Sequence, residues 1–216
     1  MEREIKQCID QTMAKGATYV DARWYPFEES NALVMWNGNL KALNASSESG
    51  VGVRVLYKGA WGFSASSSVG DLGDIFDKAL DNARVAAERV TFPVRLAEKD
   101  ALQASFSSPN AIDPFTVPMA DKVAFLQRMD AALDKPGVMQ RITAVEFVKK
   151  KIIFLDSEGS QIEKTIIDVF PMIMVMGMDK DGGMQRRKFR AGRLGKTRGW
   201  ETLDTEFFTA QAERIT

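Results

Sequence analysis

The sequence predicts an α+β fold in which antiparallel strands form meanders and helices pack on the resulting sheet. Segments with apolar residues at helical spacing are separated by longer stretches in which apolar residues alternate with polar ones. Short glycine-containing turns join those stretches. Hydrophobic residues make up 45% of the 216 residues and charged residues 27%, which is typical of a globular protein with a sizeable core.

The first half of the chain has the order helix, meander, helix. Ile5 and Ile9 lie at helical spacing ahead of Gly16, which ends the first helix. Asn37-Gly38 predicts a hairpin, because this pair readily adopts the positive φ angles of a type I′ turn. Asp71 is a preferred N-cap residue and begins the second helix. The expected elements are a helix over residues 2–15, strands over 19–25, 33–36, 40–43, 51–57 and 60–64, and a helix over 71–89.

The second half has the same order, after a connector. Residues 92–116 contain Pro93, Pro109 and Pro114 without a regular period, so a connector on the surface is expected there. The last helix has no stop signal, which predicts that the chain continues into a C-terminal half. The expected elements are a helix over 117–134, strands over 142–147, 152–155, 162–169, 172–178 and 184–189, and a helix over 205–216.

The two halves suggest an internal duplication, which we weigh against a single continuous sheet. Gly137 follows Gly16 by 121 residues, and Gly159 follows Gly38 by the same interval. Each pair of glycines occupies the same place in the order of elements, although the side chains otherwise differ. The expected organisation is an N-terminal α/β unit over 1–91, a connector over 92–116, a second helix-plus-meander unit over 117–203, and over 204–216 the start of a helix leading into a further half.

Composition excludes several classes of function. Lys and Arg number 29, as do Asp and Glu, so no overall positive charge attracts nucleic acid or an anionic membrane. The chain has no histidine, which rules out a Ser–His pair and an ordinary zinc-peptidase site within it. Cys8 is the single cysteine, so no internal disulfide can form. The charged N-terminus lacks the apolar segment of a secretory signal, and the expected location is the cytoplasm.

Three local motifs resemble binding sites but are interpreted as one glycine-rich loop and two ordinary turns. Residues 192–197 end in Gly-Lys-Thr like a phosphate-binding loop, but Arg190 occupies the place of the first required glycine. Asp179 and Asp181 resemble the start of a calcium loop, but Arg190 also stands where the bidentate glutamate belongs. Asp156 and Glu158 are interpreted as part of a solvated turn. No catalytic, cofactor-binding or metal-binding residue is predicted in this chain.

Two stretches near the C-terminal end have competing interpretations. The methionines that alternate from Met172 to Met178 share a strand with Ile173 and Val175, and we expect a central buried strand, although Met-rich faces also serve adaptable binding. From Arg186 to Arg198 lie seven basic residues and no acidic one. A solvated edge strand and loop is the simpler interpretation, and contact with phosphates, a peptide carboxylate or an acidic partner is the alternative.

Six short motifs, several of them rich in glycine, are distributed along the chain. They are GATYVDAR at residues 16–23, GVGVRVL at 50–56, GAWGFS at 59–64, IDPF at 112–115, DSEGS at 156–160 and AERI at 212–215. Together they resemble the TldD/PmbA family, whose members are described as modulators of DNA gyrase. The resemblance covers essentially the whole chain, and IDPF and DSEGS match the TldD branch better than the TldE branch.

This resemblance implies a zinc metallopeptidase that acts on peptides or unfolded segments. In the family, zinc is bound by a His-Glu-x-x-x-His helix and a later cysteine, all in the second half, and no position here matches them. The chain is therefore expected to be the N-terminal scaffold and cleft wall of a TldD-like enzyme, inactive alone. Its expected partners are its own C-terminal half and a second chain, as a homodimer or a TldD–TldE heterodimer. The alternatives are a DNA- or gyrase-associated binding module, which the zero net charge disfavours, and a stand-alone interaction scaffold.

Overall fold

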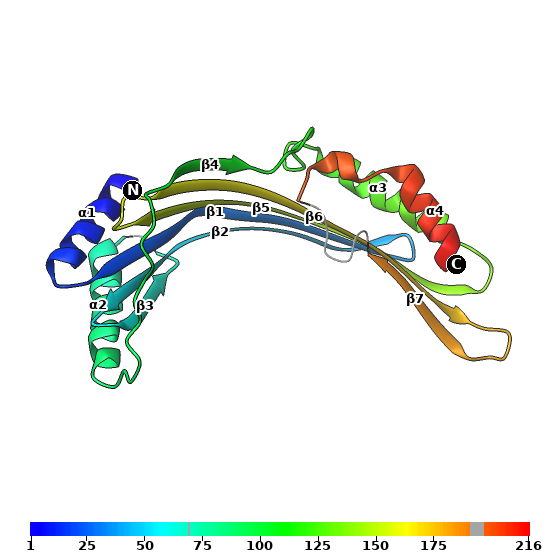
Figure 1. The fold of residues 1–216 in the computed structure, drawn as a ribbon. Helices are drawn as coiled ribbons and strands as arrows, with labels where there is room; N and C mark the ends of the chain where they lie inside the picture. The colour runs from blue at the N-terminus through cyan, green and yellow to red at the C-terminus, as the bar shows by residue number, and fades with distance from the viewer. Residues whose placement is uncertain (69, 191–196) are drawn as a thin grey trace. The chain divides into compact units, whose positions relative to one another are not determined.

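A computed structural model describes residues 1–68, 70–190 and 197–216 and has the predicted α+β fold (Figure 1). The elements follow the expected order closely, and the strands extend further than the sequence pattern indicates. They are α1 (Glu2–Ala14), β1 (Tyr19–Trp36), β2 (Asn39–Tyr57), β3 (Ala60–Ser66), α2 (Leu72–Ala87), β4 (Gln103–Ser107), α3 (Met119–Ala132), β5 (Val138–Asp156), β6 (Gln161–Met178), β7 (Met184–Arg190), the 3₁₀ helix η1 (Trp200–Thr202) and α4 (Thr205–Ile215).

The described strands form one seven-stranded sheet in the order β3-β2-β1-β5-β6-β4, with β7 also paired to β6. The sheet is built from antiparallel hairpins. β4 is the exception, because it runs parallel to β6 from Gln103 opposite Gln161 to Ser107 opposite Thr165. The sequence predicted only a connector there. All five side chains of β4 are exposed, so the strand is held by its main chain and leaves no apolar pattern to detect.

The hairpin turn predicted at Asn37-Gly38 is present. Asn37 and Gly38 have φ angles of 47° and 76°, which are the positive values of a type I′ turn. Lys58 and Gly59 have φ angles of 48° and 80° and join β2 to β3 in the same way. These local signals fix the register of each hairpin.

The chain folds into two compact units, each assembled from three segments. Unit 1 comprises Met1–Glu28, Glu48–Ser107 and Lys150–Thr165, and unit 2 comprises Glu29–Ser47, Ser108–Lys149 and Ile166–Thr216. The boundaries expected from the sequence at residues 91, 116 and 203 divide the chain by the order of its elements, whereas these units are defined by contacts. The expected boundaries therefore stay a prediction. That order does repeat, because helix, three strands and helix occur as α1 to α2 and again as α3, β5, β6, β7 and α4.

In unit 1, α1 and α2 pack on one face of the sheet. Ile5 of α1 and Phe76 of α2 join the valines of β2 in a single buried cluster. α2 approaches β3 so closely that a Cβ atom on Gly62 would lie 2.1 Å from the carbonyl oxygen of Ala79. Only glycine allows this approach of helix to strand.

In unit 2, α3 and α4 lie side by side over one face of the sheet (Figure 1). Phe125 of α3 and Phe208 of α4 meet edge to face at 5.8 Å between ring centroids, and Leu33 and Val175 close the cluster from the sheet. No helix in the described part of the chain is both long and apolar enough to cross a lipid bilayer.

Candidate functional site

The candidate site lies on the unit 1 sheet face that faces away from α1 and α2. Side chains alternate between the two faces of a strand, so Val20 and Ala22 join the core while Tyr19, Asp21 and Arg23 lie on the opposite face. On β2, Val51, Val53 and Val55 are buried in the core. Gly50, Gly52 and Arg54 alternate with them and therefore lie on the opposite face. β3 adds Trp61, whose ring meets that of Tyr19 edge to face with centroids 5.9 Å apart.

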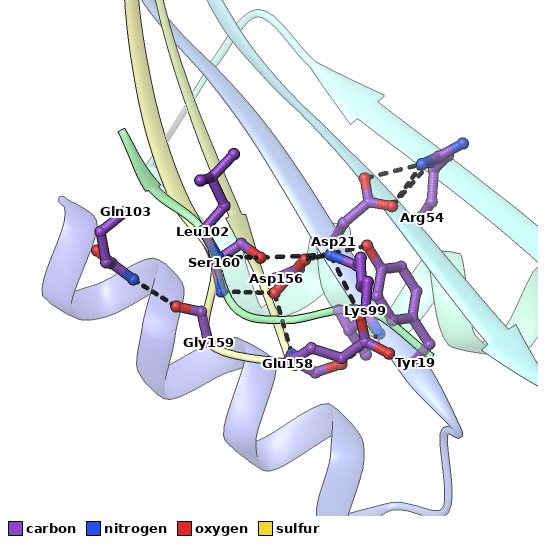
Figure 2. Close-up of polar contacts among 12 residues, drawn as sticks. Tyr19, Asp21, Arg54, Lys99, Leu102, Gln103, Asp156, Glu158, Gly159 and Ser160 are labelled. Carbon is purple, nitrogen blue, oxygen red and sulfur yellow. Dashed lines mark hydrogen bonds and ion pairs between the residues drawn. The ribbon is translucent and has the colours of Figure 1, made fainter. Parts of the chain in front are cut away.

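Asp21 lies on this face, and its side chain is completely buried. Figure 2 shows its carboxylate beside the side chain of Arg54. Arg54 donates from Nε to both carboxylate oxygens, at 3.2 and 3.0 Å, and from Nη2 to Oδ2 at 2.6 Å. Arg23 donates to Oδ1 at 3.1 Å. The hydrogen bond to Asp21 raises the pKa of Arg54, although burial opposes the shift. One carboxylate thus serves two guanidinium groups, and the cluster carries a net positive charge.

Aromatic rings support both arginines. The guanidinium carbon of Arg54 lies 5.0 Å from the ring centroid of Trp61, and that of Arg23 lies 5.3 Å from the centroid of Phe154. Both side chains remain 41% exposed. Rings and carboxylate therefore hold the two cations in place while leaving part of each arginine side chain accessible to a ligand.

A pocket of about 410 Å³ opens beside Arg23. The residues that line it include Gly50, Gly52, Tyr25 and Phe63. A Cβ atom on Gly52 would lie 3.4 Å from the Phe63 ring, so a larger residue would narrow the pocket. An arginine beside aromatic walls suits a ligand with a carboxylate and an apolar body. These lining residues include no pair of nucleophile and base that could carry out hydrolysis.

A second polar cluster fastens the connector to the β5–β6 turn, and Lys99 is its central residue (Figure 2). Lys99 Nζ lies 2.6 Å from Oδ2 of Asp156, 3.2 Å from Oε2 of Glu158 and 3.3 Å from Oγ of Ser160. Tyr19 donates its hydroxyl to Oδ2 of Asp156 at 3.4 Å. Oδ1 of Asp156 accepts from the main-chain N–H groups of Glu158 and Ser160.

The protonation of this cluster follows from its surroundings. Burial opposes ionisation of Asp156, but hydrogen bonds from Lys99 and Ser160 outweigh it, and the pKa lies below its usual value. Burial, followed by the charges of Asp21 and Asp156, raises the pKa of Tyr19. Asp156 is therefore an ionised carboxylate with donors at both oxygens, which suits a structural tie better than proton transfer.

The sequence-based interpretation of this turn as solvated was wrong for Asp156, whose side chain is fully buried. Glu158 keeps 35% of its side chain exposed. The buried position arises because the connector crosses the turn and brings Lys99 from 57 residues away.

The sequence contained one usable signal for the other cluster. Asp21 and Arg23 stand two residues apart in a predicted strand, which places them on one face.

The remaining motifs have simpler roles. Asp179 accepts hydrogen bonds from the main chain of Asp181 and Gly183 and from the side chain of Gln185, so its carboxylate closes the turn as predicted. The glycine-rich motif at 192–197 and the basic stretch 186–198 each lie partly outside the described residues, since positions 191–196 are not described.

The prediction of a strand buried on both faces was wrong for β6. Ile173 and Val175 are buried against α3 and α4, but Met174 and Met176 on the other face are only half-buried, and Met178 is 56% exposed. The helices of unit 2 pack on one face of the sheet, so the methionine face of the unit lacks their cover.

The donor groups present do not fit a zinc site. The sequence has no imidazole, and burial raises the pKa of the Cys8 thiol, which disfavours the thiolate that binds metal. Within the described ranges, no group of three or more His, Cys, Asp or Glu side chains is placed to hold a metal ion. No step of a metal-dependent reaction is therefore assigned to these residues.

Comparison with known proteins identifies the family. The model of PmbA/TldA metallopeptidase domain 1 matches residues 27–87, and that of the PmbA/TldA metallopeptidase central domain matches residues 112–216. The chain belongs to the TldD/PmbA metallopeptidase family. The resemblance drawn from the glycine-rich motifs is thereby confirmed.

Two curated relatives are similar in sequence. Metalloprotease MJ0996 from Methanocaldococcus jannaschii is 27% identical over 179 residues, which cover 82% of this chain and 39% of that protein. A metalloprotease from Methanothermobacter thermautotrophicus is 26% identical over 177 residues, which cover 82% of this chain and 37% of that protein. The chain thus spans less than half the length of these relatives.

Solved structures share the fold. A candidate modulator of a DNA gyrase from Thermotoga maritima superposes with a TM-score of 0.76 at 15% identity, covering all of this chain and 47% of that chain. TldE from Thermococcus kodakarensis superposes with a TM-score of 0.60 at 11% identity, covering 97% of this chain and 46% of that chain. At such identities the likeness concerns the fold alone.

Proposed function

We propose that this chain is the N-terminal scaffold and cleft wall of a TldD-like zinc metallopeptidase that acts on peptides or unfolded segments. One observation carries the proposal. The two matched family models are named as the first and central domains of a metallopeptidase, while the chain has no histidine. The zinc ligands are then expected in a further part of the protein, and the 216 residues bind and orient rather than catalyse.

The open face of unit 1 is the part of this chain that we assign to the cleft wall. Arg23 is anchored by the buried Asp21 and stacked on Phe154, so its remaining donors keep a fixed direction. A rigid guanidinium beside an aromatic pocket would bind a peptide carboxylate without rearrangement. Such positioning lowers the entropic cost of holding an unfolded segment for cleavage elsewhere in the enzyme.

A second chain of the same family is the proposed partner. The likeness in fold to TldE supports a TldD–TldE type of association, and a homodimer is the alternative. Sedimentation of the chain alone and mixed with a TldE-type protein distinguishes the two. A mixed complex supports the heterodimer, and self-association without a mixed complex supports the homodimer.

Metal analysis beside a peptide-cleavage assay tests the proposed activity. The 216-residue chain should retain no stoichiometric zinc after mild chelation and should cleave no unfolded peptide, because it lacks imidazole ligands. A longer chain that includes the His-Glu-x-x-x-His segment expected of the family should gain both properties. Chelator-sensitive cleavage by the 216-residue chain, after removal of contaminating proteases, would contradict the proposal.

A further inference from the structure

β6 and β7 of unit 2 place a row of cations beside the row of methionines. In the antiparallel register, Lys188 lies opposite Met174 and Arg186 lies opposite Met176. Directly opposite residues share a face of the sheet. Because Ile173 and Val175 of β6 and Phe189 of β7 pack toward α3 and α4, the rows of methionines and cations occupy the other, open face. Arg190 opposite Met172 extends both rows.

The three cations of this row have no anionic partner among the described residues. Within that part of the chain, no ion pair or hydrogen bond involves the side chain of Arg186, Lys188 or Arg190. Loss of hydration, followed by the charges of Arg190 and Arg186, lowers the pKa of Lys188. The row therefore repels itself, and a line of negative charges would relieve that repulsion.

The outer edge of β7 presents main-chain donors and acceptors to a further strand. Among the described strands, β7 pairs with β6 alone. The N–H of Asp179 donates to the carbonyl of Gly183 at 2.9 Å, so these two residues form a hydrogen-bonded pair of the ladder. Along an antiparallel ladder, hydrogen-bonded pairs alternate with pairs whose main-chain groups point away from the partner strand. The main-chain groups of Arg186, Lys188 and Arg190 consequently point away from β6, toward the free edge.

The two sides of this edge differ in character. The open face carries the three cations. The face toward α4 carries Arg187 and Phe189, and the ring of Phe189 meets that of Phe207 with centroids 5.9 Å apart. Phe207 is 44% exposed. A strand added at this edge would place alternate side chains on the two faces, so acidic residues would meet the three cations and the intervening apolar residue next to Phe189 would meet the two phenylalanines.

We propose that the free edge of β7 binds an extended peptide segment in which acidic residues alternate with apolar ones, as an additional strand of the sheet. The segment is a substrate segment, and only this assignment rests on the proposed peptidase function. A nucleic acid fits less well, because its phosphates accept hydrogen bonds but cannot donate to the free carbonyl groups of the edge. Binding to the 216-residue chain needs no catalysis, so it is measured independently of zinc and of cleavage.

Fluorescence anisotropy with a labelled peptide tests the charge complementarity. The probe has the core Glu-Leu-Glu-Leu-Glu between Gly-Ser flanks, and a matched probe has lysine in place of glutamate. The variant Arg186→Glu/Lys188→Glu should raise the Kd of the glutamate probe by on the order of tenfold, since exposed ion pairs contribute modestly. The control Arg95→Glu/Lys164→Glu reverses one arginine and one lysine at exposed positions of unit 1 and should leave Kd unchanged.

Two N-methylated forms of the glutamate probe test the main-chain pairing on the unaltered protein, which also covers the case of a variant that fails to fold. One form is methylated at the glutamates and the other at the leucines. Strand addition predicts that one form loses binding and the other keeps it, because alternate N–H groups face the edge. Any one of four results would overturn the inference. They are equal Kd values for the two methylated forms, equal effects of the two double variants, tight binding of the lysine probe, and displacement of the peptide by a tighter-binding single-stranded oligonucleotide.

Discussion

Replacing Asp21 by asparagine should lower the free energy of unfolding by about 2 kcal/mol, because Asp21 holds two arginines at once. Its side chain is completely buried and accepts from Arg54 and Arg23. Breaking a fully buried ion pair costs roughly 3–5 kcal/mol. Both arginine side chains are 41% exposed, however, so water can hydrate them when the carboxylate is lost. The expected loss is therefore nearer that of a charged hydrogen bond, roughly 1.5–3 kcal/mol.

The reciprocal change should cost more. Arg54→Met leaves the Asp21 carboxylate without solvent and with Arg23 as its one cation, so the expected loss is about 3–4 kcal/mol. Urea denaturation measures both variants against Asp10→Asn, an exposed site on α1 where the change should stay within about 0.5 kcal/mol. If Asp21→Asn matched that control, or if Arg54→Met were milder than Asp21→Asn, the reasoning from the buried carboxylate would be refuted.

Three further outcomes are expected. Gly62→Ala should lower the thermal midpoint by more than about 5 °C, because its Cβ would lie 2.1 Å from the Ala79 carbonyl oxygen, and circular dichroism measures this. Lys99→Met should cost about 1 kcal/mol at pH 7 in urea denaturation. The pKa of Asp156 is lowered in the folded state, so this stability is present above its unfolded pKa of about 3.9 and the difference should vanish as pH falls through the folded pKa. The basic stretch 186–198 should bind duplex DNA weakly and without sequence preference, and binding that remains tight and selective at physiological salt would contradict this.

Most helices and turns could be predicted from the sequence because their causes are local. Asp71 caps α2 by accepting from the N–H of Asp74, as its residue type and position indicate. Asn37-Gly38 adopts the expected turn for the same reason, since few other pairs tolerate two positive φ angles. Signals of this kind lie within a few residues of the structure that they specify, so a single sequence contains them.

The features that could not be predicted depend on distant segments. β4 pairs through its main chain and exposes every side chain, so no pattern of apolar residues marks it. Asp156 is buried because Lys99 and the connector cover it from elsewhere in the chain. The methionine row of β6 shares its strand with the buried Ile173, and the sequence cannot tell which of two apolar faces the helices cover.

The two cation clusters have different physical roles, and the placement of carboxylates explains why. In unit 1 the guanidinium groups of Arg23 and Arg54 share a buried carboxylate and stack on rings, so their charges are part of the folded structure. In unit 2 the row around Lys188 has no carboxylate partner among the described residues, so removing a cation there relieves repulsion. Arg54 should therefore affect stability first, whereas the row on β7 should affect binding first. A charge that contributes little to folding and lies along a free strand edge is available for recognising an acidic segment.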